Sequence, residues 1–181
     1  MQRGIVGPGR STMAEPAGLR IAPFEPHRLD AVVGLSLRAW APVFASLYRA
    51  MPPAIVRAFY PEGWPEGWQV RQRAALEAVA GDGEHRLWVA LMDEAVAGFV
   101  AVRTHAADSL GEITMIAVDP AYQRRGIGGA LTRFALARMR EAGLAVAMVE
   151  TGGDDGHAPA RRTYAGAGFT LWPVARYFRA L

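Results

Sequence analysis

The stretch from residue 112 to residue 151 limits the folds open to this chain more than any other. EITMIAVD (112–119) is an apolar strand pattern, GIGGALTRFALARMREAG (126–143) is an amphipathic helix pattern, and LAVAMVET (144–151) is a second apolar strand pattern. Two strands joined by one helix form a βαβ crossover, in which the strands run parallel and the helix covers the sheet. The pattern therefore predicts a buried, parallel strand at 144–151 and a helix that Gly143 terminates.

The rest of the chain adds helices and strands on both sides of this crossover. A period of 3.6 residues predicts helices, and short apolar runs between turn residues predict strands. Pro42 is expected to open a second helix within 28–50, because proline fits a first helical turn. The other expected elements are a strand at 19–24, helices at 54–60, 64–83 and 157–168, a hairpin of strands at 86–92 and 96–105, and one or two strands over 169–181. This order indicates a mixed α/β (α+β) fold.

Length and composition favour one globular domain. The chain has 181 residues, of which 51% are hydrophobic and 20% are charged. We expect a disordered leader over 1–17, without a secretory signal, and a single domain over 18–181. No run of about 18 apolar residues predicts a membrane span, so a cytoplasmic protein is expected.

Missing residue types and the charge distribution exclude several kinds of site. Cysteine is absent, so disulfides, cysteine zinc sites and a thiol nucleophile are excluded. The four histidines are scattered singly, and we expect no metal site. All 20 basic residues are arginines spread along the chain, and the net charge is only +3, which disfavours nucleic-acid binding. The absence of lysine and asparagine indicates GC-rich codon usage and hence a high-GC bacterium.

The loop between the first crossover strand and its helix is suited to a phosphate. A helix N-terminus leaves about four N–H groups without internal partners and carries partial positive charge. Three glycines between 126 and 129 let a ligand approach those amides, and Arg124 and Arg125 add full charges. Neither common nucleotide motif fits, because a Walker loop requires lysine and a Rossmann fingerprint requires glycine where Leu131 stands.

The loop also resembles a known family. QRRGIG (123–128) resembles the Q/R-x-x-G-x-G/A signature of the GCN5-related N-acetyltransferases (GNAT superfamily). EITMIAVDPAYQ (112–123) resembles that family's central strand, and ARRTYAGAGF (160–169) resembles its A-R-R-x-Y-x-x-x-GF pattern. The resemblance is specific over about 110–170 and rests on element order alone over 19–105. It implies a twisted, mostly antiparallel mixed sheet of six to seven strands with a central βαβ crossover and flanking helices.

The resemblance implies acetyl-CoA as the acetyl donor, and it implies that homodimers are common among such proteins. The CoA pyrophosphate is expected on the loop, and the pantetheine arm on the central strand where the strands 112–118 and 144–150 splay apart. An N–H group near Ile116 or Ala117 is expected to polarise the thioester carbonyl. The residues so assigned to the cofactor are Ile116, Ala117, Val118, Gln123, Arg124, Arg125, Gly126, Ile127, Gly128, Gly129, Ala130 and His157.

Two residues are predicted to move protons during transfer to an amine. Glu112 opens the central strand, where the resemblance implies a base that often acts through water; the alternative is a solvated carboxylate. Tyr164 holds the family's tyrosine position and is expected to protonate the leaving sulfur; the alternative is a packed tyrosine with a structural hydrogen bond. His157 stands where the family often has asparagine, so we expect it to contact the CoA arm or to cap the last helix. Asp154 and Asp155 are expected to form the turn before that helix.

Aromatic residues supply candidates for an acceptor pocket. Trp40, Phe44 and Tyr48 share one helical face and either line that pocket or belong to the core. Two further tryptophans, Trp64 and Trp68, are expected in the core, and at most one of Tyr177 and Phe178 is expected to face the cleft.

The predicted function is an N-acetyltransferase that moves acetyl directly to an amine of a small molecule or a peptide, in a ternary complex. The alternatives are an acetyl-CoA sensor without turnover and a nucleic-acid binder. Glu112 and Tyr164 argue against the sensor, because a pure binder needs neither group.

Overall fold

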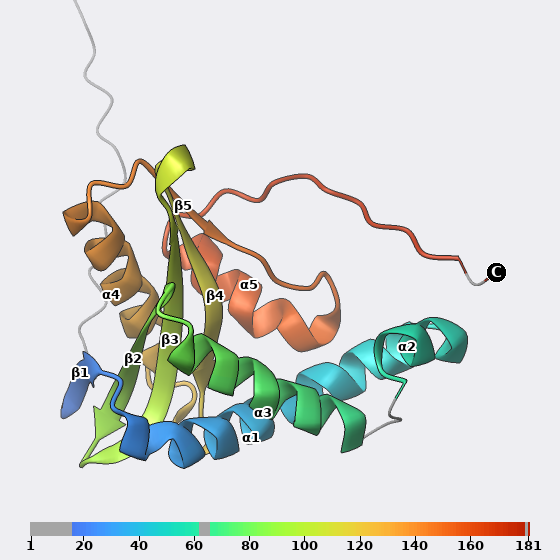
Figure 1. Cartoon of the computed structure of the whole chain (residues 1–181), viewed down its shortest axis with the longest axis horizontal. Coiled ribbons are helices and arrows are strands. Elements are labelled where there is room, and N and C mark those ends of the chain that lie inside the picture. The colour runs from blue at the N-terminus through green and yellow to red at the C-terminus, as the bar shows by residue number, and fades with distance from the viewer. Residues whose placement is uncertain (1–15, 62–65, 180) are drawn as a thin grey trace, which may run out of the picture.

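The structure is a computed structural model that describes residues 16–61, 66–179 and 181. Its centre is one twisted sheet in the order β1-β2-β3-β4-β5 (Figure 1). All neighbours run antiparallel except β4 and β5, which run parallel as the crossover predicts. The strands are β1 (Leu19–Pro23), β2 (His85–Met92), β3 (Ala95–His105), β4 (Leu110–Val118) and β5 (Val146–Val149). The mixed, mostly antiparallel fold is confirmed. The predicted leader lies, except for its last two residues, outside the described residues.

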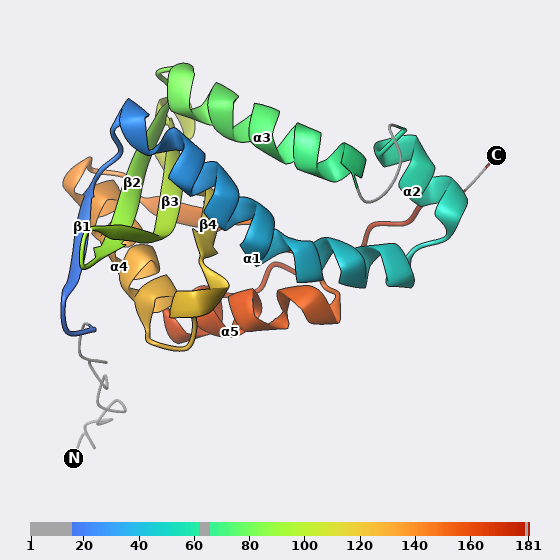
Figure 2. The same cartoon turned by 90° about the horizontal axis from the view of Figure 1, so that it is seen from below.

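Helices cover both faces of the sheet (Figure 2). On one face α1 and α3 enclose a core cluster with Leu35, Leu76 and Phe99, and on the other α4 buries Ile127 and Leu131 against the strands. Truncating such a buried side chain to alanine typically costs about 2–5 kcal/mol. The helices are α1 (Leu29–Ala50), α2 (Pro53–Phe59), α3 (Glu66–Gly81), α4 (Ile127–Glu141) and α5 (Ala158–Gly166).

The first helix differs from the prediction, because Pro42 does not open a second helix. α1 is one helix of 22 residues with Pro42 inside it. Proline removes one helical hydrogen bond, but the helix continues because both halves are packed: Val32 and Val33 lie in the core, and Trp40 and Phe44 pack with other aromatic rings. The tertiary contacts of the two halves therefore stabilise the helix more than Pro42 destabilises it.

The same helix is the reason that one segment resembles a membrane span. Pro26–Ala50 is the one helix among the described residues that is long and apolar enough to cross a bilayer by length and composition. Such a match is weak evidence, because a helix that packs along a sheet has the same composition.

Strands β4 and β5 part halfway along β4. Their parallel pairing runs from Leu110↔Val146 to Ile113↔Val149 and stops there. At this point the register between β3 and β4 shifts, because Thr114 is an extra residue opposite Ala101 and Val102. Such a bulge bends a strand and increases its twist. The rest of β4 therefore turns away from β5 and leaves an edge that no described strand covers.

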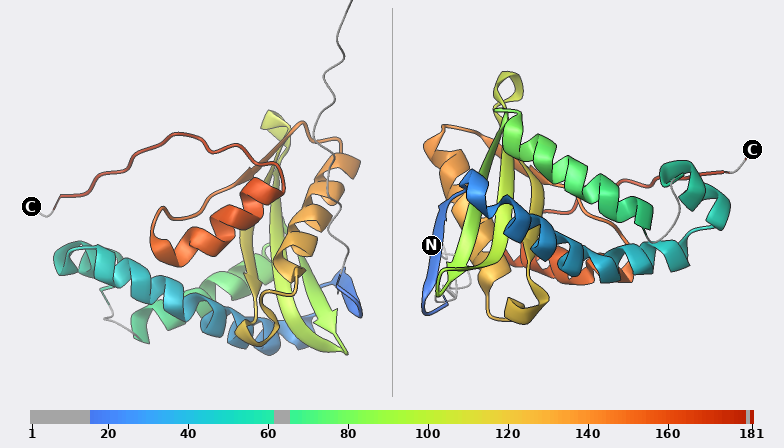
Figure 3. Two further views of the ribbon diagram at one scale, coloured as in Figure 1. Left: turned by 180° about the vertical axis from the view of Figure 1, so that it is seen from behind. Right: turned by 60° about the horizontal axis from the view of Figure 1, so that its bottom comes forward.

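The C-terminal segment corrects two predictions. Residues 169–179 form no strand, and Leu171, Trp172 and Tyr177 are exposed. Figure 3 shows this segment extending from the end of α5 toward α2 without joining the sheet. A strand needs a neighbour for its backbone hydrogen bonds, and Pro173 lacks an amide donor. The sheet consequently has five strands instead of six or seven.

The second correction concerns β5, which was expected to be buried. Its side chains Val146 and Met148 are exposed. Because no described strand pairs with its outer side, β5 is an edge strand of four residues. Apolar composition alone does not distinguish a central strand from an edge strand.

Candidate active site

A cleft of about 330 Å³ opens where β4 and β5 part. It is bounded by β4, by the residues at and after the end of β5, by the middle of α1, and by α5 with the turn that precedes it. Tyr60, which follows α2, closes one end. The lining residues are Trp40, Val43, Phe44, Leu47, Tyr60, Ile113, Thr114, Met115, Ile116, Val149, Glu150, Thr151, Gly156, His157, Ala160 and Tyr164.

Aromatic rings from α1 form much of one wall. Of the two alternatives left open by the sequence, Trp40 and Phe44 take the first and line the cleft, whereas Tyr48 is exposed and does not. Phe44 stacks on Trp68 with ring centroids 4.6 Å apart and meets Tyr60 edge-on at 5.7 Å. Trp68 is 2% exposed, which confirms its place in the core.

Three other aromatic residues lie elsewhere. Trp64 lies outside the described residues. Neither Tyr177 nor Phe178 lines the cleft, and Phe178 packs against Phe59 with centroids 5.2 Å apart. The aromatic wall of the cleft is thus contributed by Trp40 and Phe44 of α1 and by Tyr60.

Tyr164 projects from α5 into the opposite side of the cleft. Its ring is 8% exposed and meets Phe169 edge-on at 6.0 Å. Burial raises the pKa of Tyr164 to about 12, because the phenolate is poorly solvated there. The phenol therefore stays protonated at neutral pH and can give a proton but not readily remove one.

The loop after β4 ends in an open helix terminus. The first hydrogen bond of α4 runs from the Ala130 amide to the Gly126 carbonyl at 3.0 Å. Within the described part of the chain no hydrogen bond engages the amides of residues 123–129. These donors, at the positive end of a helix dipole, suit an anion.

Local conformation keeps these amides open. Gly126 has a φ of 84°, a left-handed conformation that favours glycine. Arg124 and Arg125 are exposed beside it, and the Arg125 guanidinium lies over the Tyr122 ring at 5.4 Å. The Gln123 side chain instead donates to the Val118 carbonyl at 3.0 Å and folds the loop back on β4.

The start of this loop is fixed by an ion pair that the sequence analysis missed. Asp119 is buried, accepts the Ala121 amide at 2.9 Å and binds Nη2 of Arg38 from α1 at 2.5 Å. Burial by itself raises the pKa of Asp119, but the Arg38 and Ala121 hydrogen bonds outweigh it, so the pKa lies below its usual value. The pair ties α1 to the loop from the far side of the sheet.

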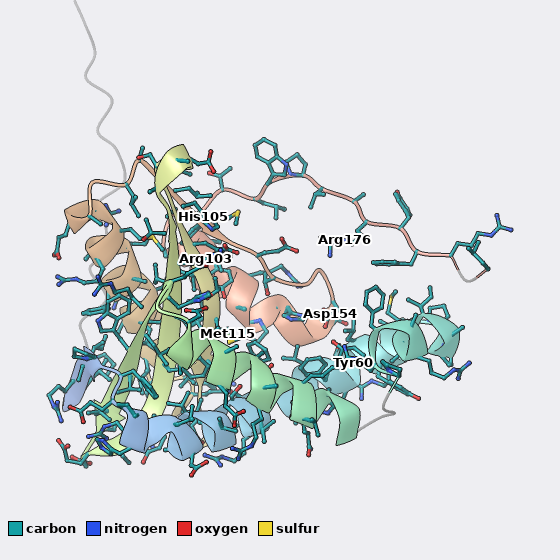
Figure 4. The ribbon with its side chains drawn as sticks, viewed as in Figure 1. Tyr60, Arg103, His105, Met115, Asp154 and Arg176 are labelled. Carbon is teal, nitrogen blue, oxygen red and sulfur yellow. The ribbon has the colours of Figure 1, made fainter. Side chains whose placement is uncertain are left out.

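Glu112, the predicted base, does not line the cleft. Its Oε2 lies 2.8 Å from Nε2 of His105, and both side chains are partly buried. Figure 4 shows His105 and Arg103 on the upper part of β3, away from Asp154 and Tyr60. Glu112 is therefore not among the lining residues, although the next residue, Ile113, is.

His157 lines the cleft and is held by an aspartate. Its Nδ1 lies 2.5 Å from Oδ1 of Asp154, whose Oδ2 accepts the Gly156 amide at 3.0 Å. This confirms the predicted turn role of Asp154, while the His157 side chain makes no cap hydrogen bond to α5. Burial raises the pKa of Asp154, but the hydrogen bond and charge of His157 and the Ser46 hydroxyl outweigh it, so that the pKa is lowered.

Sequence reasoning also missed Glu150 and Tyr60. Glu150 follows β5, is largely exposed and lies 3.3 Å from the Arg176 guanidinium. Burial raises the pKa of Tyr60, although Arg71 partly offsets this. No local motif marks either residue, because each lines the cleft only as a result of packing between segments that are distant in the sequence. One signal was present for the histidine: an Asp-x-x-His spacing that brings carboxylate and imidazole together within one turn.

Comparisons with known proteins identify the family of this chain. A model of the acetyltransferase (GNAT) family matches residues 53–169. The mycothiol acetyltransferase of Thermomonospora curvata is 30% identical over 159 residues, which are 88% of this chain and 46% of that protein. That of Thermobispora bispora is 29% identical over 170 residues, 91% of this chain and 50% of that protein. The chain thus spans about half the length of these relatives.

Solved structures share the fold. The ribosomal-protein-S18-alanine N-acetyltransferase from Escherichia coli superposes with a TM-score of 0.62 at 21% identity, over 86% of this chain and 79% of that chain. The PaiA N-acetyltransferase from Thermoplasma acidophilum, in complex with coenzyme A, gives a TM-score of 0.63 at 13% identity, over 87% and 92%. The family match spans well over half of the sequence. This chain therefore belongs to the acetyltransferase (GNAT) family.

Proposed function

We propose that this protein moves the acetyl group of acetyl-CoA directly to an amine in a ternary complex, in the cytoplasm. One observation carries the proposal: the uncovered part of β4 and Tyr164 line one cleft, and the same strand leads to the open N-terminus of α4, where Gly128 lies beside Val118 of β4 and Thr163 of α5. A donor that lies along this edge would meet an acceptor inside the cleft. Proximity then supplies much of the rate.

The residues present fit acetyl-CoA. Free amides at 123–129 and the exposed Arg124 and Arg125 suit a pyrophosphate, and the edge of β4 from Thr114 to Val118 offers backbone groups to an amide-bearing arm. When bound, acetyl-CoA supplies the thioester carbonyl carbon that an amine attacks. The predicted cofactor residues from Ile116 to Val118 and from Gln123 to Ala130 are the groups that would hold it.

Tyr164 is the acid of this proposal. Its protonated phenol faces the cleft and would give its proton to the departing sulfur. Glu112, the base predicted from sequence, lies beside His105 and outside the cleft lining, so it could reach the acceptor only through water.

The acceptor is an amine of a small molecule or a peptide. The relatives' names include mycothiol acetyltransferases and an enzyme for an alanine of a ribosomal protein, so both classes are represented. Aromatic side chains and one carboxylate, that of Glu150, line the cleft, which suits an amine attached to an apolar group. A homodimer is part of the proposal, as is common among proteins of this kind.

The donor site is tested by changing one glycine. A Cβ on Gly128 would meet Val118 Cγ2 at 3.7 Å, an ordinary contact, so Gly128→Ala is a matched control that the fold accommodates. Gly128→Glu adds a carboxylate where the pyrophosphate would bind, and like charges in contact cost several kcal/mol. We expect calorimetry to show at least about 100-fold weaker acetyl-CoA binding, since about 2.8 kcal/mol is 100-fold. Unchanged affinity in Gly128→Glu would reject the loop as donor site.

Turnover is tested by release of the CoA thiol. Wild-type protein is mixed with acetyl-CoA and with tyramine, glucosamine, spermidine or a tripeptide that begins with alanine. We expect amine-dependent release with at least one of them. Acetyl-CoA binding without release for any amine would favour the sensor alternative.

A further inference from the structure

The pair of His157 and Asp154 is a second candidate for the proton acceptor, and it lies in the cleft itself. We infer that His157 takes the proton from the acceptor amine and that Asp154 is the positioning residue that orients it. The inference rests on the proposed function and replaces Glu112 in the base role. It follows from burial, hydrogen bonding and the tautomer that they impose.

The pair is held on several sides. The Asp154 side chain is 12% exposed and that of His157 is 26% exposed. The Arg161 guanidinium donates to the Asp154 carbonyl at 2.7 Å and to the Gly152 carbonyl at 2.6 Å. From α1, the Ser46 hydroxyl accepts the Gly156 amide at 3.1 Å. The turn that carries the imidazole is thus fixed to both walls of the cleft.

The carboxylate decides which ring nitrogen carries the proton. An ionised carboxylate only accepts hydrogen bonds, so Nδ1 of His157 is the protonated nitrogen in the neutral ring. Nε2 then bears a lone pair, and no residue in the described part of the chain forms a hydrogen bond with it. A neutral imidazole in this state accepts a proton or an N–H group, and it does not donate to a carbonyl of the CoA arm.

Other ionisable groups surround this imidazole, and none duplicates its arrangement. Asp155 belongs to the same turn, and Arg161 and Tyr164 come from α5. Glu150 follows β5 and Tyr60 follows α2, while the cleft-lining residues of α1 carry no ionisable group. The Glu150 carboxylate is 73% exposed and paired with Arg176, so it is more solvated than the Asp154 and His157 pair.

The transfer step balances with these two groups. Nε2 of His157 takes one proton from the ammonium form of the acceptor, and the freed lone pair forms a C–N bond with the acetyl carbonyl carbon. The C–S bond breaks, and the sulfur leaves with the electron pair and takes the Tyr164 proton. The second proton lost by the nitrogen restores the phenol, and the imidazolium releases its proton to water. The products are an amide, a thiol and one proton.

The decisive variant is His157→Asn. Asparagine keeps an amide for hydrogen bonds to the donor but cannot take up a proton. A general base works only in its deprotonated form, so the wild-type kcat/KM should rise with pH until that form predominates. In His157→Asn we expect about 100-fold lower kcat, acetyl-CoA affinity within about threefold of wild type, and loss of that rise.

The chain offers a matched control in His85→Asn. His85 also binds an aspartate three residues earlier, through Nδ1 at 2.7 Å, but it does not line the cleft. This variant should keep the wild-type rate and pH profile. Should His157→Asn fail to fold, as judged by its thermal midpoint, His157→Gln replaces it in the same measurements.

Each result counts for or against the inference. Weaker acetyl-CoA binding with an unchanged kcat in His157→Asn would make His157 a donor contact and overturn the base role. So would a pH rise that persists in His157→Asn and disappears in Glu150→Gln or Glu112→Gln. Wild-type protein that releases no thiol with any amine would overturn the proposed function as well, which separates the two failures.

Discussion

Two turns of this protein share one local design and differ in what surrounds them. Asp82 lies in the connection between α3 and β2, and His85 is the first residue of β2, whereas Asp154 and His157 both lie in the connection between β5 and α5. Each aspartate binds Nδ1 of a histidine three residues later, at 2.7 Å in the first turn and 2.5 Å in the second. Each also accepts backbone amides within its turn.

The surroundings separate the two pairs. Asp82 and His85 lie at the start of a strand, where the imidazole pairs with nothing but its own turn among the described contacts. Asp154 and His157 are packed against α1 through Ser46 and against α5 through Arg161, and the imidazole lines the cleft with Tyr164. An Asp-x-x-His pair therefore stabilises a turn wherever it occurs, and only a place beside a cleft can give its imidazole a reactive role.

The largest effect is expected at Tyr164, which lines the cleft together with His157. Tyr164→Phe keeps the ring against Phe169 and removes the acid. We expect about 100-fold lower kcat with acetyl-CoA affinity unchanged, because positioned acid catalysis contributes at least that much. Rates are followed by thiol release and affinity by calorimetry. An unaltered kcat would leave Tyr164 as a packed residue and weaken the contrast between the turns.

A smaller effect should separate the two aspartates. Asp154→Asn is expected to lower kcat about 10-fold, because asparagine no longer fixes the tautomer of His157, while Asp82→Asn should leave kcat unchanged. Equal losses of kcat in the two variants would remove the distinction between the turns.

Both replacements should nevertheless lower the thermal midpoint at pH 7. Hydrogen bonds from His85 and the Glu84 amide lower the pKa of Asp82, and the pKa of Asp154 is lowered as well. A lowered folded-state pKa stabilises the fold above the unfolded value of about 3.9, and this contribution is lost as the pH falls through the folded-state pKa. The difference in midpoint between wild type and each variant should therefore shrink below about pH 4. Thermal unfolding from pH 7 to pH 3 measures it, and a constant difference would contradict the linkage.

The smallest effect is expected at the third histidine–carboxylate pair. Glu112→Gln keeps the contact with His105 but removes the charge. Since this pair does not line the cleft, kcat should stay within about threefold of wild type, and the free energy of unfolding should fall by about 1 kcal/mol or less. A rate that falls most steeply at low pH would instead support the base predicted from the sequence.

The crossover shows how far sequence patterns reach. The strand, loop and helix between residues 112 and 143 lie where the pattern predicts, and the parallel pairing of β4 and β5 follows from it. These features depend on residues within a few turns of one another. Apolar spacing sets the buried face, and Gly126 permits the left-handed conformation at the helix start.

The wrong predictions share a different cause. Pro42 reads as a helix start, residues 169–179 read as strands, and 144–151 reads as a buried strand, but each outcome depends on distant partners. α1 continues because both its halves are packed, whereas 169–179 pairs with no described strand and leaves β5 at the edge. A local sequence pattern predicts an element of secondary structure, but packing against distant parts of the chain decides whether that element forms.

The sequence by itself determined the order of the elements around the crossover, the glycines and arginines of the loop at 123–130 and the spacing of each Asp-x-x-His turn. Those properties arise from hydrogen bonds and periodicities between near neighbours. Only the tertiary structure decided which imidazole faces the cleft, that Glu112 does not line it, and that Glu150 and Tyr60 do. A cleft is made where elements from distant parts of the chain meet, because the bulge at Thr114 parts two strands and α1 and α5 close over the gap.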